Sequence, residues 1–132
     1  MSYNLSLLLP GCPTCGAAPG DVLGGLNVTR NVSRIVDLCI SSGRPDLKAK
    51  TEGFSGSTAD YSWCRLHGWT GAELVPVLEA AIAAADDPGR RAEFVALEPS
   101  NGWGSLVHVR EAFALLLACC REHPTAACEV RG

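Results

Sequence analysis

The sequence predicts an α+β domain in which a small, mostly antiparallel sheet is packed by three main helices. Three segments carry apolar residues at helical spacing, and they lie at 31–40, 71–85 and 105–120. Four short segments alternate or are continuously apolar, as strands are, and they lie at 2–9, Leu26–Thr29, 61–66 and 126–131. Because these strands and helices do not alternate regularly, a doubly wound parallel sheet is not expected.

The first helix follows directly on a polar strand. Apolar residues recur at i, i+3, i+4, i+7 and i+8 from Val32 to Ile40, which predicts one buried helical face. Asn31 is the predicted N-cap, since its side-chain oxygen can accept a hydrogen bond from a free N–H of the first turn. Upstream, Asn27 and Thr29 alternate with apolar residues, as in a half-buried strand.

The later helices have clear start and stop signals. Thr70-Gly-Ala-Glu73 is a capping-box pattern that predicts a helix over 71–85, with Pro76 in its second turn. Asp87-Pro88 predicts a short helix to about residue 97. Ser105 is the predicted cap of the last helix, and Pro124 ends it.

Composition limits the classes of function. A chain of 132 residues with 47% hydrophobic and 19% charged residues predicts one folded domain, 1–132, rather than a disordered chain. The net charge of −3 does not favour nucleic acid as a partner, because phosphate binding needs clustered basic residues. The apolar run 5–9 is too short for a signal peptide and no stretch is long enough to span a membrane, so a cytoplasmic protein with no membrane partner is expected.

Cysteine spacing suggests a zinc site. Cys12 and Cys15 are separated by two residues in a turn that contains Pro and Gly, which is typical of two ligands of one tetrahedral metal. Cys64 and His67 have the same separation and would complete a Cys3His structural zinc site. The alternatives are a buried Cys64 that packs as a small hydrophobic residue and a His67 that serves in a turn. The seven cysteines are expected to be reduced thiols or metal ligands, and Cys119 and Cys120 are expected to pack rather than react.

Residues 41–60 are rich in Gly, Ser and Thr and predict an irregular loop. A loop of this length is functional, for example as a lid with Phe54 at its tip, or it is a disordered insertion. The pattern alone does not choose between these two interpretations.

Three segments share their order and motifs with a known group of proteins: residues 26–31 (LNVTRN), 69–82 (WTGAELVPVLEAAI) and 101–117 followed by Pro124. With its Ser-Tyr-Asn-Leu start, the chain thereby resembles a group of small, uncharacterised phage and bacterial proteins, over about half its length. That group has an Asn-x-Thr-x-Asn segment, a Thr-Gly-Ala-Glu-x-x-Pro helix and a leucine-rich last helix. The Cys12/Cys15 pair departs from it. The resemblance implies a phage counter-defence role such as sequestering a nucleotide signal.

The leading functional hypothesis is a non-enzymatic protein that binds an anionic, nucleotide-like small molecule at the strand-to-helix junction 27–34. A helix N-terminus with two nearby arginines attracts anions, and tryptophans supply flat apolar walls. The predicted ligand-binding residues are Asn27, Thr29, Arg30, Asn31, Arg34, Trp69, Thr70, Asn101 and Trp103. The structural alternatives are polar residues that only flank a capped helix, and a Trp103 that fills the core.

Two other functions compete with this hypothesis. The first is a zinc-stabilised protein-interaction module, in which the helices present a surface to a protein partner. The second is a small hydrolase, which is disfavoured because no histidine stands near a Gly-x-Ser-x-Gly motif and no paired carboxylates suggest acid–base catalysis. Nothing in the sequence indicates the oligomeric state.

Overall fold

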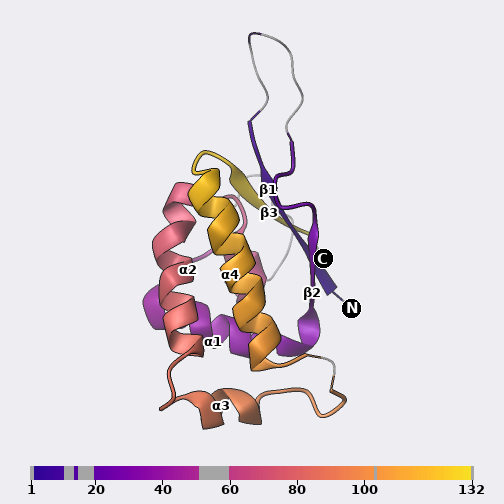
Figure 1. Ribbon diagram of the computed structural model, residues 1–132, viewed down its shortest axis with the longest axis vertical. Helices are drawn as coiled ribbons and strands as arrows, with labels where there is room; N and C mark the ends of the chain where they lie inside the picture. Colours follow the sequence, from indigo (N-terminus) through magenta and orange to yellow (C-terminus); the bar gives the residue numbers. More distant parts are fainter. Residues whose placement is uncertain (1, 11–13, 15–19, 51–59, 103, 132) are drawn as a thin grey trace.

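The computed structural model describes residues 2–10, 14, 20–50, 60–102 and 104–131. It confirms the predicted α+β class: a three-stranded antiparallel sheet is covered by helices, with strand order β2-β1-β3 (Figure 1). The strands are β1 (Ser2–Leu8), β2 (Leu26–Thr29) and β3 (Ala127–Arg131). The helices are η1 (Arg30–Val32), α1 (Ser33–Gly43), η2 (Ser62–Leu66), α2 (Gly71–Ala85), α3 (Arg91–Ala96) and α4 (Leu106–Glu122), where η marks a 3-10 helix.

The sheet has one apolar face and one polar face, as alternation along β1 predicts. Tyr3, Leu5 and Leu7 are buried, and their register partners Val28, Val130 and Cys128 are buried on the same face. Asn4 is exposed on the opposite face, next to Asn27 of β2. β1 is therefore the central strand, and β2 and β3 are the two edges of the sheet.

The helices pack as a layer on the apolar face of the sheet. α2 and α4 lie side by side and run in opposite directions (Figure 1). At Gly71 a Cβ atom would lie 2.6 Å from the carbonyl oxygen of His123, so the start of α2 touches the end of α4. Trp63, Phe94 and Phe113 are the largest fully buried side chains. Among the described helices, none is long and apolar enough to cross a membrane.

Several local predictions are confirmed. Thr70 and Glu73 form the capping box of α2, and that helix tolerates Pro76 in its second turn. Ser105 caps α4 by accepting a hydrogen bond from the backbone N–H of His108. The C-terminal segment is an edge strand. The short helix after Pro88 begins later than expected, at Arg91, because residues 87–90 form a turn in which Asp87 accepts from the Gly89 N–H.

The prediction that Asn31 caps the first helix is wrong. Thr29 is the cap: its Oγ1 accepts a hydrogen bond from the backbone N–H of Asn31, at 3.3 Å. The chain then passes through the 3-10 turn η1 before α1 begins at Ser33. The helical conformation therefore starts earlier than the apolar periodicity indicates, because the strand residue Thr29 supplies the hydroxyl.

The prediction of a strand over 61–66 is also wrong, because Ser62–Leu66 form the 3-10 helix η2. Ser62 begins it with a φ of +55°, which a non-glycine residue rarely adopts. Asp37 of α1 stabilises this conformation by accepting the Ser62 N–H at 2.8 Å. All five residues of η2 are buried, so the segment is an internal connection and not a fourth strand.

The irregular segment predicted over 41–60 is shorter at its start. Residues 41–43 complete α1, and the chain leaves the helix at Arg44. Residues 44–50 have no regular structure, but Leu47 and Ala49 are buried in the core. Phe54, with the rest of 51–59, lies outside the described residues.

Candidate functional site

A groove of about 450 Å³ lies between the edge strand β2 and helix α4. This volume is in the range of small-molecule sites, which are mostly apolar with a few polar groups. Its described lining comes from β2, η1, η2, α4 and the loop before α4. The lining residues are Leu26, Asn27, Val28, Thr29, Val32, Trp63, Gly104, His108, Val109, Glu111, Ala112 and Leu115.

The backbone edge of β2 forms one wall of the groove. All four residues of β2 line it, although successive side chains of a strand point to opposite faces. A cavity that touches four consecutive strand residues therefore runs along the edge of the strand. On its other side β2 pairs with β1, so this outward edge is the free edge of the sheet.

One face of α4 forms the opposite wall. His108, Glu111, Ala112 and Leu115 follow one another at helical spacing of three and four residues. Leu115 is 48% exposed, which is unusual for a leucine in this chain. The Nδ1 atom of His108 lies 3.1 Å from the Ser105 hydroxyl, so the capping serine also orients this imidazole.

Buried residues close the groove on its inner side. The Trp63 side chain is fully buried, its ring centroid lies 4.9 Å from that of Phe113, and its Nε1 has no hydrogen-bond partner among the described residues. Gly104 has a φ of +123°, and a Cβ atom there would lie 2.7 Å from a methyl carbon of Val32. Only glycine allows the loop before α4 to approach the strand-to-helix junction this closely.

Structure is described for eight of the nine predicted ligand-binding residues, and two of these eight, Asn27 and Thr29, line the groove. The Nδ2 atom of Asn27 donates to Ser2 Oγ and to Asn4 Oδ1, each at 3.0 Å. These bonds tie β2 to β1 on the polar face of the sheet. Thr29 uses its hydroxyl as the cap described above.

The predicted cationic residues lie beside the groove but do not line it. The guanidinium carbon of Arg30 lies 4.4 Å from the ring centroid of Tyr3, where cation and ring attract each other. Burial raises the pKa of the Tyr3 hydroxyl, the neighbouring Cys64 thiol adds to this, and Arg30 opposes it. Arg34 and Asn31 are exposed on the first turns of the helix.

Trp69 and Thr70, two of the predicted ligand-binding residues, lie away from the groove. Trp69 donates its Nε1–H to the carbonyl of Lys48 at 2.7 Å, and Thr70 caps α2. The start of α2 contacts the end of α4, whereas the groove lies near the start of α4, and this helix of 17 residues is about 25 Å long. Asn101 is exposed and does not line the groove. Trp103 lies outside the described residues.

The predicted zinc ligands are described only in part. Cys12 and Cys15 lie outside the described residues, and within the described ranges no group of three or more His, Cys, Asp or Glu side chains is placed to hold a metal ion. Cys64 is buried beside Tyr3, and the Nδ1 atom of His67 accepts the Val130 N–H at 3.1 Å. The zinc site stays a prediction, which metal analysis of the purified protein would test.

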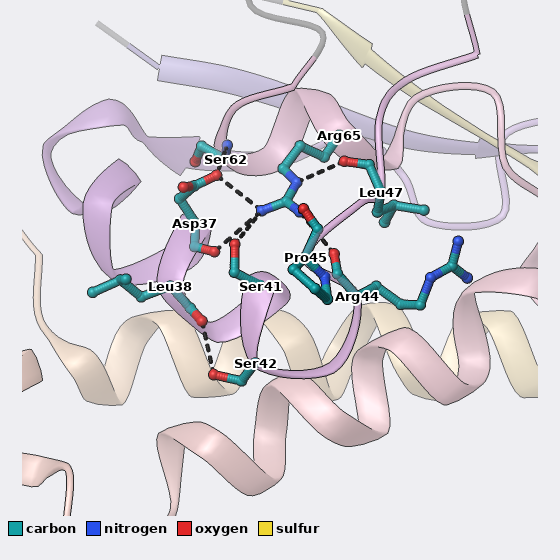
Figure 2. Close-up of polar contacts among 9 residues, drawn as sticks. All are labelled: Asp37, Leu38, Ser41, Ser42, Arg44, Pro45, Leu47, Ser62 and Arg65. Carbon is teal, nitrogen blue, oxygen red and sulfur yellow. Dashed lines mark hydrogen bonds and ion pairs between the residues drawn. The ribbon is translucent and has the colours of Figure 1, made fainter.

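Arg65 makes the most hydrogen bonds of any side chain in the described structure, and no pattern in the sequence predicted it. It is only 2% exposed, and its three guanidinium nitrogens donate six hydrogen bonds (Figure 2). The acceptors are the carbonyls of Asp37, Arg44, Pro45 and Leu47, the carboxylate of Asp37 and the hydroxyl of Ser41. Because all its N–H groups donate to protein oxygens, Arg65 holds segment 44–47 against α1 and has no unused donor for a ligand.

The groove residues of α4 were also missed. The sequence has a signal for Leu115: like Val107, it is an apolar residue outside the apolar stripe of the predicted helix, which indicates an exposed apolar surface. Trp63 has no such signal, because residues 61–66 have the pattern of a short strand.

Comparisons with known proteins add no relative: the chain matches no protein-family model, no curated protein and no solved structure.

Proposed function

We propose that this protein is a non-catalytic binding protein and that the groove between β2 and α4 holds its ligand. The observation that carries the proposal is the groove itself: about 450 Å³ of open space between a strand edge and an exposed apolar helix face. Water in an apolar groove is readily displaced by apolar ligand surface, and this displacement drives binding. The exposed Leu115 is one of the lining residues and adds apolar surface to the groove.

The lining supports an elongated, largely apolar ligand with a few polar groups. Asn27, Thr29, His108 and Glu111 are the polar members of the lining. Among the described residues that line the groove, none is lysine or arginine, and Glu111 would repel an anion. The geometry therefore favours a neutral or cationic ligand over the anionic, nucleotide-like ligand that the sequence suggested.

The nucleotide-sequestering role implied by the resemblance is the second candidate, and one observation favours it. Neither η1 nor α1 has an acidic residue in its first turn, so no carboxylate neutralises the partial positive charge at this helix start. Arg34 is exposed on the first turn of α1. An anion would then bind at the helix start beside the groove and not inside it.

One pair of substitutions tests the groove. Ala112→Trp fills it, whereas Ala118→Trp places the same side chain on an exposed position of α4 outside it. We expect native mass spectrometry of the freshly purified protein, and calorimetry with uncharged aromatic and aliphatic compounds, to show binding to wild type and Ala118→Trp and none to Ala112→Trp. Equal binding by both variants, or no binding to wild type, would overturn the proposal.

The same calorimetric series, extended to nucleotides, cyclic nucleotides and dinucleotides, tests the second candidate. Binding that is lost in Arg34→Ala but kept in Ala112→Trp would favour the helix start. No heat with any nucleotide would remove that candidate.

A further inference from the structure

We propose that the ligand is an extended peptide segment of a partner protein, which adds to the free edge of β2 as a fourth strand and presents a basic side chain to Glu111. This inference rests on the proposed function, since it names the class of ligand for the same groove. Three features carry it: the hydrogen-bonding edge, the dimensions of the two walls and the charge of the helix wall.

The first feature is the free backbone edge of β2. At an edge strand, every second residue directs its N–H and C=O groups away from the sheet. Within the described part of the chain, no backbone hydrogen bond joins residues 26–29 to any segment other than β1. The groove therefore has a row of donors and acceptors along one wall, and an extended backbone satisfies such a row better than a compact apolar molecule does.

The second feature is the match in length between the walls. The four residues of β2 span about 13 Å at the rise of a strand. From His108 to Leu115 the wall of α4 spans about 10 Å at the rise of a helix. A peptide of four or five extended residues covers both walls, with its backbone on β2 and every second side chain directed toward Ala112 and Leu115.

The third feature is charge. Glu111 is an exposed carboxylate in the middle of the helix wall. The neighbouring Arg110 attracts it, but the guanidinium of Arg110 forms its ion pair with Asp86, at 3.1 Å. The exposed residues Val107 and Leu115 lie one turn before and after it. This wall is complementary to a peptide whose alternate, wall-facing residues are apolar with one lysine or arginine between them.

A defined peptide tests this inference: acetyl-Thr-Val-Thr-Lys-Thr-Val-Thr-amide, titrated calorimetrically into the full chain. Its two valines and its lysine are alternate residues, so all three side chains face the wall of α4. We expect the peptide to bind wild type and Ala118→Trp, and not Ala112→Trp. Nuclear magnetic resonance of ¹⁵N-labelled protein should show the largest shifts at the amides of residues 26–29.

Two N-methylated versions of the peptide provide matched controls for strand pairing. One carries methyl groups on the backbone nitrogens of its second, fourth and sixth residues, and the other on those of its third and fifth residues. Because alternate N–H groups of a strand face one edge, only one version loses the bonds to β2. We expect that version to bind about tenfold or more weakly, since two or three hydrogen bonds are lost, and the other to bind within about twofold of the parent.

A charge reversal tests the role of Glu111. Replacing the peptide lysine by glutamate should weaken binding to wild type, and Glu111→Lys should restore it. Equal effects of the two methylation patterns, or no peptide binding by a protein whose groove still takes small apolar compounds, would overturn the peptide inference while leaving the proposed function intact. A concentration-dependent dimer that Ala112→Trp abolishes would also overturn it, because the edge would then pair with a second copy.

Discussion

Two neighbouring regions of this molecule differ in how far their polar groups are hydrogen-bonded. Arg65 and Trp63 lie two residues apart on η2, and each belongs to a different region. Around Arg65 every guanidinium nitrogen donates to a nearby oxygen, and the acceptors come from α1 and segment 44–47 (Figure 2). Around Trp63 the indole nitrogen has no partner within the described structure, and the strand edge across the groove is free.

This difference in hydrogen bonding indicates that the Arg65 region stabilises the fold, whereas the groove is suited to bind a ligand. A buried charged group with all its bonds satisfied stabilises one conformation, and it offers a ligand no unused donor. A groove with unused donors, acceptors and apolar surface is the kind of place where a ligand gains free energy on binding. Substitutions in the Arg65 region are therefore expected to change stability alone, whereas those in the groove change stability, binding or both.

The largest expected effect is that of Arg65→Met. Removing the guanidinium leaves Asp37 and four carbonyls without their buried donor, so the free energy of unfolding should fall by about 3–4 kcal/mol. Urea denaturation measures this change. Arg65→Lys should recover only part of the loss, since an ammonium cannot reproduce the planar fork. Arg34→Ala, which removes an exposed arginine, is the control. If both variants lost the same unfolding free energy, the hydrogen bonds of Arg65 would not be the cause of its effect.

Gly104→Ala comes next and acts in the groove. The new methyl would lie 2.7 Å from Val32 and 3.1 Å from Thr29, in a backbone conformation unsuited to alanine, so we expect a loss of roughly 2–3 kcal/mol. Gly102→Ala is the matched control in the same loop: its φ is also positive, but no atom lies within 4 Å, and about 1 kcal/mol is expected. Equal melting temperatures for the two variants would show that the close approach of the loop to η1 does not affect stability.

Thr29→Ala should have a smaller effect. The variant removes the hydroxyl that caps η1, which should lower the free energy of unfolding by about 1 kcal/mol in thermal or chemical denaturation. Thr29→Ser keeps the hydroxyl and should retain most of the stability. If Thr29→Ala were as stable as wild type, capping by this residue would be unimportant, and its hydroxyl would be available to a ligand in the groove.

The smallest expected effect is a pH dependence at His67. Burial lowers the pKa of this imidazole, and the nearby Glu129 carboxylate partly opposes the shift. Neutral His67 accepts the Val130 N–H, and the unfolded chain takes up a proton at a higher pH than the folded one. The contribution of His67 to stability is therefore complete above the ordinary pKa of about 6.5 and is lost as the pH falls below it.

Melting temperatures at pH 7.5 and 5.5 measure this effect. Wild type should lose more stability over this range than His67→Asn, whose amide oxygen can accept the same N–H without titrating. Parallel curves for the two proteins would mean that this polar contact, unlike that of Arg65, does not stabilise the fold.

Much of the fold could be predicted because its signals are local. The capping box of α2, the serine cap and apolar stripe of α4, and the alternation along β1 each depend on residues within one or two turns of each other. The candidate site was predicted only in part. Asn27 and Thr29 line the groove, but Trp69 and Thr70 lie toward the other end of α4, because the packing of α2 against α4 places them there.

The sequence by itself determined the α+β class, the three main helices and the three strands of the sheet, since each is specified by periodicity within its own segment. The fourth strand predicted over 61–66 and the Asn31 cap are wrong. The tertiary structure alone decided that 61–66 is a 3-10 helix, because Asp37, 25 residues earlier, bonds the Ser62 N–H, and Arg65 bonds carbonyls 18 to 28 residues away. It also decided where the groove lies, because the close approach of Gly104 to Thr29 and Val32 places the loop before α4 against the end of β2. Such contacts between distant segments leave no periodic pattern in the chain, so only the folded structure reveals them.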